Sequence, residues 1–206
     1  MAAMAPETTT QRRMPAAERR AALLDVAERL FVDRGFSSVT IEDIAREAGI
    51  TRPIVYRHFT ALDGVYLACV QRARDDYAGE LVQAIADAQG VHPREQLRLG
   101  ADLFFRILER DPGRWRLLFG GGASLSGEYA EQLAGLRLGT IEAIGAALLQ
   151  ATVEAPPGRM EVTAHAVSGV GERLGFWWLD HPDVPREELV EHFVEITWAG
   201  VAPYAR

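Results

Sequence analysis

The chain has 206 residues, of which 48% are hydrophobic and 25% are charged, as in a globular protein with a substantial core. A single cysteine, Cys69, excludes an intrachain disulfide and a cysteine-only zinc cluster, and we expect it to be a small core residue. No apolar run approaches the roughly 20 residues that cross a bilayer, and residues 1–13 lack the apolar segment of a signal peptide. These features predict a cytoplasmic protein without a membrane partner.

The charge is distributed unevenly along the chain, whose net charge is -7. All 22 basic residues are arginine. Residues 1–60 carry nine arginines and eight acidic residues (net +1), whereas residues 61–206 carry 13 and 21 (net -8). This asymmetry fits an N-terminal part that meets phosphate groups, and it fits equally well an arm beside an ordinary charged surface.

The first 34 residues divide into an arm and a helix. Residues 1–14 show no hydrophobic period, which predicts a flexible arm. From Pro15 to Arg34, apolar residues recur at spacings of three and four, which predicts a helix with one buried face. Gly35 follows directly and is a common helix stop.

A short helix and a tight turn are predicted next. Thr40 and Asp43 have the spacing of a capping box, with aspartate in the usual place of glutamate. They start a short helix that we expect to end near Glu47. Gly49 then allows the positive φ that a tight turn needs.

A second short helix follows the turn and completes a helix-turn-helix motif. Thr51 can cap it, Pro53 fits its first turn, and it ends near Phe59. Arginine contacts guanine edges or phosphates, and tyrosine and histidine donate to phosphate oxygens. The motif therefore predicts DNA binding by the polar side chains of this helix, which are Arg52, Tyr56, Arg57 and His58. A purely structural helical hairpin is the alternative.

The remainder of the chain is also helical in its periodicity and shows no sustained strand alternation. Helices are expected over residues 61–88, 94–110, 115–119, 127–153, 160–179 and 186–202. The predicted fold class is therefore all-α, with about nine helices. Its organisation is an arm (1–14), a helix-turn-helix domain (15–60) and a helical bundle (61–206).

Residues 19–66 resemble the DNA-binding domain of TetR/AcrR-family transcriptional regulators over about a quarter of the chain. The matching residues are Ala27–Phe31, Gly35-Phe36, Val39–Ala45, Ala48–Thr51 and Val55–Phe59. The resemblance implies a dimeric repressor that binds double-stranded DNA and whose variable C-terminal domain binds a small-molecule effector. It also implies that Thr40, Tyr56 and His58 lie near phosphates and that Arg52 lies near bases or backbone.

One position departs from the family pattern. Leu62 stands where the family often has a phosphate-binding lysine, so Arg57 or the N-terminal arginines are expected to compensate. The complete set of expected DNA-binding residues is Thr40, Thr51, Arg52, Pro53, Tyr56, Arg57, His58, Arg12 and Arg13.

The C-terminal segment is similar to the dimerisation helices of the same family, through Gly175–Leu179, His181-Pro182 and Trp198–Gly200. The last helix has an apolar arc over nearly half its circumference, which is more than one core contact needs. We expect a homodimer with twofold symmetry, which demands a roughly palindromic operator. The expected interface includes Leu189, Phe193, Ile196 and Val201. A deeply buried helix in a monomer is the alternative.

An effector pocket is expected beside the helix at residues 94–110, whose apolar arc is wide. The expected ligand-binding residues are Phe104, Leu108, Trp115, Phe119, Leu133, Arg137, Thr140 and Trp177. Arg137 lies on the apolar stripe of its helix, where an unpaired charge is costly. It can pair with a carboxylate of the fold, extend its charged end to solvent, or bind an anionic ligand.

These features together predict a ligand-responsive, sequence-specific DNA-binding regulator, and we expect a repressor that a hydrophobic small molecule releases from its operator. Motifs of zinc proteases, serine hydrolases and P-loop proteins are absent, so we expect no catalytic residue, metal or cofactor. Two alternatives remain, a hydrolase that uses Ser124 or Ser126 with His165 and a structural helical adaptor. His165 is otherwise interpreted as a surface or interface residue.

Overall fold

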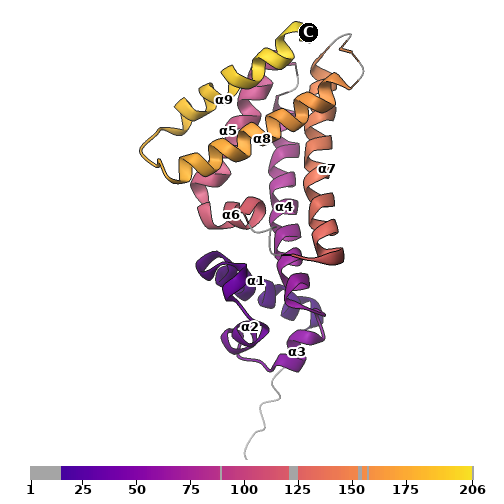
Figure 1. The fold of residues 1–206 in the computed structure, drawn as a ribbon, viewed down its shortest axis with the longest axis vertical. Helices are drawn as coiled ribbons and strands as arrows, with labels where there is room; N and C mark the ends of the chain where they lie inside the picture. Colours follow the sequence, from indigo (N-terminus) through magenta and orange to yellow (C-terminus); the bar gives the residue numbers. More distant parts are fainter. Residues whose placement is uncertain (1–14, 89, 121–124, 153–154, 157, 206) are drawn as a thin grey trace, which may run out of the picture.

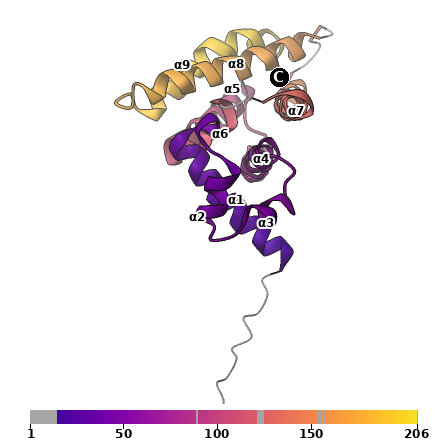
Figure 2. The same ribbon diagram turned by 60° about the horizontal axis from the view of Figure 1, so that its bottom comes forward.

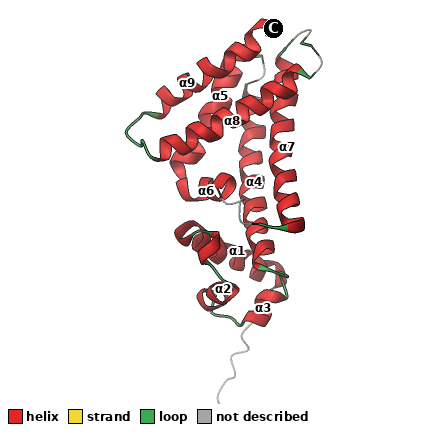
Figure 3. Ribbon diagram, in the orientation of Figure 1, coloured by secondary structure: helices red, strands yellow, loops and turns green. Residues whose placement is uncertain are grey.

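The computed structural model describes residues 15–88, 90–120, 125–152, 155–156 and 158–205. Within these ranges the chain forms nine α-helices and two short 3₁₀ turns, and its only strand-like pairing is an isolated bridge between Thr152 and Ala205 (Figure 3). The all-α prediction is therefore confirmed. The predicted arm, with Arg12 and Arg13, and also Ser124, lies outside the described residues.

Three helices form the N-terminal domain at the lower end of the molecule in Figure 1, namely α1 (Ala16–Arg34), α2 (Ile41–Glu47) and α3 (Arg52–Tyr56). A 3₁₀ turn, η1 (Phe36–Ser38), connects α1 to α2. The buried residues of α1 recur at spacings of three and four, as the sequence predicts. They meet Ile44 of α2 and Val55 of α3, both fully buried, so one small core holds the three helices together.

Local backbone chemistry sets the ends of these helices. Gly35 and Gly49 have φ of 75° and 65°, a region that favours glycine. The capping box is formed, because the Asp43 amide donates to Thr40 Oγ1 (3.1 Å) and the Thr40 amide donates to the Asp43 carboxylate (3.0 Å). Thr51 occupies the N-cap position of α3.

The expected side-chain cap by Thr51 is wrong, since its hydroxyl makes no capping hydrogen bond. An N-cap side chain normally accepts from the second or third amide of the helix. Pro53 supplies no amide hydrogen at the second position. The third amide, that of Ile54, donates instead to the Thr51 carbonyl oxygen at 2.9 Å.

Six helices build the C-terminal domain, which are α4 (Leu62–Asp87), α5 (Pro93–Arg110), α6 (Pro112–Gly120), α7 (Gly127–Ala151), α8 (Arg159–Leu179) and α9 (Arg186–Val201). Helix α4 rises from the N-terminal domain beside α7, and α8 and α9 form a layer at the opposite end of the molecule (Figures 1 and 2). A last 3₁₀ turn, η3 (Ala202–Tyr204), follows α9. The predicted helices agree closely with these bounds.

By length and apolar composition alone, residues Gly127–Gln150 of α7 could cross a membrane. Only 11% of that window is buried. The helix packs beside α4 and α8, and Arg137 and Glu142 interrupt its apolar sequence. One helix of this length and composition is weak evidence for a membrane span.

The hydrophobic interior of the described residues consists of a lower core, an upper core and a third, smaller cluster of Leu148, Met160, Ala164 and Val201. The lower core joins α1–α3 to the first half of α4, to Leu117 and Leu118 of α6, and to Leu133 of α7. The upper core is rich in aromatic rings, and Trp115 is fully buried there, 4.8 Å from the Phe119 ring and 5.0 Å from that of Phe176. The lower core therefore continues from α1–α3 into α4, across the boundary that the sequence predicts at residue 60.

Helix α8 approaches α6 so closely that only glycine fits at position 175. A Cβ atom there would lie 2.4 Å from Cζ2 of Trp115. We predict that Gly175→Ala lowers the free energy of unfolding by about 1–3 kcal/mol, because overpacking displaces the indole. Urea denaturation followed by circular dichroism measures the change.

Gly139→Ala is the matched control, since a Cβ atom at that exposed glycine of α7 meets nothing within 4 Å. It should stabilise the protein by about 0.5–1 kcal/mol through helix propensity. Equal stability of the two variants would contradict the close packing of α8 on α6.

Candidate functional site

The helix-turn-helix presents its polar side chains to solvent. Arg52, Tyr56 and Arg57 are exposed, whereas Val55 between them is fully buried and anchors α3 in the lower core. Thr40 lies at the exposed start of α2. Thr51 and Pro53 are also exposed, and His58 is half-buried. The expected DNA-binding residues that the structure describes therefore gather on the end of the molecule opposite α8 and α9 (Figure 1).

Arg52 is held between the two short helices. Its Nη1 donates to Glu42 Oε1 of α2 at 2.9 Å. A hydrogen bond with Tyr56 and the nearby Glu42 carboxylate both raise the pKa of Arg52. More than half of each side chain of this ion pair remains exposed, so the pair orients Arg52 more than it stabilises the fold.

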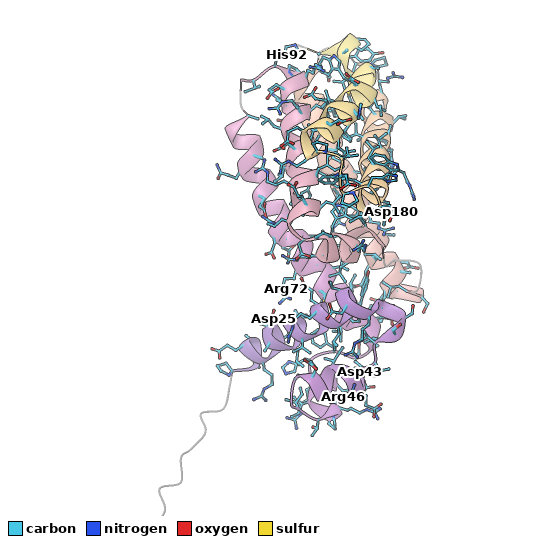
Figure 4. All side chains as sticks on the ribbon, turned by 90° about the vertical axis from the view of Figure 1, so that its left-hand side faces the viewer. Asp25, Asp43, Arg46, Arg72, His92 and Asp180 are labelled. Carbon is cyan, nitrogen blue, oxygen red and sulfur yellow. The ribbon has the colours of Figure 1, made fainter. Side chains whose placement is uncertain are left out.

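Thr40 uses its hydroxyl within the capping box. Thr40 Oγ1 donates to the Asp43 carboxylate at 2.5 Å, and hydrogen bonds from Thr40 are the largest cause of the lowered pKa of Asp43. Arg46 pairs with the same carboxylate, and Figure 4 shows Asp43 and Arg46 at the far end of the N-terminal domain. The hydroxyl hydrogen of Thr40 is thus engaged before any phosphate arrives.

Two arginines lie at or beside the helix-turn-helix motif, after which Leu62 stands where the family often has a lysine. Arg57 is exposed, and it has no ion-pair partner within the described part of the chain. Arg20 of α1, one of the N-terminal arginines expected to compensate, places its guanidinium 4.9 Å from the centroid of the Phe59 ring, beside the end of the motif. It belongs to a group of four arginines near the N-terminus, at positions 12, 13, 19 and 20. Leu62 itself packs against the lower core.

A cavity of about 440 Å³ lies within the C-terminal domain, bordered by residues of α4, α5, α6, α7, α8 and α9. This volume is in the range of small-molecule sites, and most of the lining is apolar. Three of the expected ligand-binding residues line it, namely Phe104, Phe119 and Thr140. Small residues that the sequence analysis missed create much of the space, and they include Ala84, Gly100, Ala143, Ala147 and Gly171. The sequence signal that could have identified them is their position on the faces of their helices that point into the bundle.

Four other expected ligand-binding residues lie away from the cavity. Leu108 and Trp115 are buried in the upper core, where neighbouring side chains surround them. Leu133 packs into the lower core, because the first half of α7 reaches down beside α4. Trp177 is exposed and stacks on His181 with ring centroids 4.2 Å apart.

Arg137 also lies outside the cavity lining. Its Nη2 donates to the carbonyl oxygen of Phe119 at 3.1 Å, in the last turn of α6. Its Nε is buried without a hydrogen-bond partner in the described ranges, and no carboxylate there forms an ion pair with it. Of the three interpretations of this residue, pairing with a carboxylate of the fold is therefore wrong for the residues described.

Three of the four expected dimer residues are occupied inside their own subunit. Leu189, Phe193 and Val201 are buried, because the apolar arc of α9 packs on α5 and α8. Phe193 and Val201 also line the cavity. Ile196 is 57% exposed and remains available for a partner subunit.

A helix-turn-helix with an exposed basic helix, followed by a helical domain that contains an apolar cavity, defines a DNA-binding regulator with an effector domain. A model of bacterial regulatory proteins of the tetR family matches residues 23–69, and a model of the tetracyclin repressor-like C-terminal domain matches residues 93–200. The chain belongs to the TetR family of transcriptional regulators. It is a ligand-responsive, sequence-specific DNA-binding regulator.

Individual relatives agree with the family assignment. The HTH-type transcriptional activator FasR of Mycolicibacterium smegmatis is 28% identical over 191 residues, or 92% of this chain and 86% of that protein. The crystal structure of a TetR-like transcriptional regulator from Rhodococcus sp. RHA1 has a TM-score of 0.71 and 26% identity, over 92% of this chain and 99% of that one. FadR from Bacillus subtilis in complex with stearoyl-CoA has a TM-score of 0.72 and 13% identity, over 88% and 98%, and shows the fold alone.

The ion pair between Arg52 and Glu42 provides a test of base reading. We predict that Glu42→Gln frees Arg52 and lowers the discrimination between operator and mismatched DNA by about 1 kcal/mol. Fluorescence anisotropy with the two duplexes measures this difference.

Glu47→Gln is the matched control, because it removes the same charge from an exposed position on the same helix. Both variants should bind all DNA more tightly, since one negative charge is lost near the phosphates. Unchanged discrimination in Glu42→Gln would show that the pair does not restrain a base-reading arginine.

Proposed function

We propose that this regulator is a repressor and that an apolar ligand in the cavity releases it from its operator. The observation that supports this proposal is that α6 contacts both the cavity and the lower core that holds the helix-turn-helix. Its Phe119 lines the cavity, and its Leu117 and Leu118 pack into the lower core with the helix-turn-helix. A ligand that displaces the Phe119 ring thus moves a helix on which the DNA-binding domain rests.

Ion pairs connect the same elements. Arg114 of α6 lies 3.1 Å from Glu28 of α1 and also pairs with Asp76 of α4. Arg72 of α4 pairs with Glu28 and with Asp25, each at 2.6 Å. Figure 4 shows Asp25 and Arg72 at the junction of the two domains. A shift of α4 or α6 is thereby transmitted to α1, which packs on α2.

The proposed DNA contacts divide by accessibility. Arg57 and Tyr56 bind phosphates, and Arg52 reads a base edge after exchanging Glu42 for DNA. His58, half-buried, donates to a phosphate, and Arg20 adds a further phosphate contact at the edge of the surface. Thr40 contributes by fixing the start of α2, because its hydroxyl hydrogen serves Asp43. Thr51 and Pro53 are exposed at the start of α3, and this turn lies close to the DNA.

The cavity favours a ligand with a long apolar body. Its lining offers phenyl rings and aliphatic side chains, with few polar groups, among them Gln96, Ser168 and Thr140. A structural neighbour, FadR, was solved in complex with stearoyl-CoA. We therefore propose an acyl chain as the ligand class. Each buried methylene adds about 0.8 kcal/mol of transfer free energy, so affinity should grow with chain length.

A second copy of this chain is the proposed partner of the α8 and α9 surface. Homodimers are typical of the family. Three large apolar side chains remain exposed on these helices, namely Val162 (67%), Trp177 (44%) and Ile196 (57%). A dimer through this face presents two helix-turn-helix domains and selects a roughly palindromic operator with half-sites about 34 Å apart, or a multiple of that. We propose that the protein has no catalytic role and that it is located in the cytoplasm.

The proposed function is tested by mobility shift with DNA that flanks the coding sequence of this chain. We predict a specific complex whose affinity falls steeply with salt, and at least a tenfold weaker complex when stearoyl-CoA is added. Tyr56→Phe should weaken binding to every sequence by about 1 kcal/mol, because a hydroxyl donor to phosphate is lost.

Tyr204→Phe, which removes a hydroxyl beyond α9, is the control and should bind DNA normally. Failure to select any sequence from random duplexes at low salt would overturn the proposed DNA contacts. A complex that persists when acyl ligands saturate the protein would overturn ligand release. A reporter gene under the selected operator tests repression, and higher expression in the presence of the regulator would overturn it.

The dimer surface has its own test. We predict that Ile196→Arg yields a monomer that no longer binds the palindrome, because the guanidinium would be buried at the seam. Leu138→Arg, the same kind of change at an exposed position of α7, should remain a dimer. Sedimentation velocity at micromolar concentration measures both. Dissociation by Leu138→Arg alone would move the interface to α7.

A further inference from the structure

A charged residue without an acidic partner lies beside the cavity. Arg74 of α4 is half-buried, and its Nη2 donates to the hydroxyl of Thr140 and to the carbonyl oxygen of Leu136, both on α7. Thr140 lines the cavity, as does Tyr77, one turn further along α4. Across the described ranges no carboxylate forms an ion pair with Arg74. A guanidinium has five N–H donors, and the bonds to α7 use only Nη2.

A second arginine increases the positive charge at this end of the cavity. Arg137 of α7 is bonded to Phe119 as described above, and its Nε is buried without a partner in the described part of the chain. Burial and the charge of Arg137 together lower the pKa of Arg74, so the free protein keeps these two cations near each other at a cost.

The opposite charges nearby do not cancel the two arginines. Glu172 of α8 lines the cavity and attracts Arg74, but it forms no ion pair with it in the described structure. Glu80, which lies near Tyr77, is occupied by Arg110 at 2.7 Å. Burial raises the pKa of Tyr77 to about 12, so its phenol stays neutral and can donate a hydrogen bond. Two arginines and Glu172 leave one net positive charge at this end.

We infer that the cavity binds an amphiphile whose apolar chain fills its hydrophobic part and whose anionic oxygen group pairs with Arg74 beside Tyr77 and Thr140. The inference rests on the proposed function, in which the cavity holds the effector, and it assigns the polar end of that ligand. The anion neutralises the unpaired charge, and Arg74 exchanges its bond to the Thr140 hydroxyl for a charge-assisted pair. A free carboxylate and the phosphates of an acyl-CoA supply the same chemistry from two sources.

The test compares ligands that share one chain and differ only at the head. Hexadecanoate, hexadecan-1-ol and hexadecanoyl-CoA are titrated below their critical micelle concentrations into the full chain, with intrinsic tryptophan fluorescence as the readout. We expect hexadecanoate to bind roughly ten- to a hundredfold more tightly than the alcohol. A stronger preference for hexadecanoyl-CoA, lost in the same variants, would identify the phosphates as the anionic group instead.

Variants connect that preference to the arginine. Arg74→Gln should reduce the preference for the acid to about one and keep the affinity for the alcohol, whereas Arg74→Lys should retain part of it. Glu172→Gln should strengthen binding of the acid, because the one negative group of the cluster is neutralised. Arg106→Gln is the control, since Arg106 is exposed on α5 and pairs with Asp102 away from the cavity, and it should behave as the unmutated chain.

The outcomes separate this inference from the proposed function. Equal binding of acid and alcohol, with release of DNA by both, overturns the anionic site and leaves the apolar effector intact. Full preference for the anionic ligands in Arg74→Gln, with a melting temperature close to that of the unmutated protein, overturns the role of Arg74. Absence of binding by all three ligands overturns both proposals.

Discussion

Helix α6 packs against two cores at once, and the placement of both sites depends on this constraint. Trp115 and Phe119 face the aromatic upper core, while Leu117 and Leu118 face the lower core that holds the helix-turn-helix. Tyr66 of α4 donates to the Leu117 carbonyl oxygen at 3.0 Å, which fixes α6 against α4 as well. Because α6 places side chains in both cores, a movement of α6 at one face requires repacking at the other. The cavity wall and the DNA-binding domain are therefore mechanically connected.

Ion pairs also connect α4 and α6 to α1. Glu28 of α1 accepts contacts from Arg72 of α4 and Arg114 of α6, so one carboxylate joins three helices. At α6 the first turn also approaches α1 so closely that a Cβ atom at Gly113 would lie 2.2 Å from Val32 Cγ1. A ligand needs a few kcal/mol of preference for the released form to change DNA occupancy appreciably.

Much of the N-terminal domain was predictable from the sequence, because its signals are local. Gly49 allows the tight turn, and the capping box of Thr40 and Asp43 fixes the start of α2. Neither feature depends on residues that are distant in the sequence. The cavity was harder to predict, since periodicity shows that Phe193 faces an apolar neighbour but not whether that neighbour belongs to the same subunit. Arg74 was missed because its partners on α7, 62 and 66 residues away, become neighbours only in the folded bundle.

The most direct measurement of the coupling is a thermodynamic cycle on the full chain, with operator and ligand affinities each measured with and without the other. The account predicts that both ratios give the same factor and that Arg114→Gln reduces this factor by roughly threefold or more, with the separate affinities nearly unchanged. Arg116→Gln, an exposed change on the same helix, should leave the factor as it is. An unchanged factor in Arg114→Gln would contradict transmission through the contact between α6 and α1.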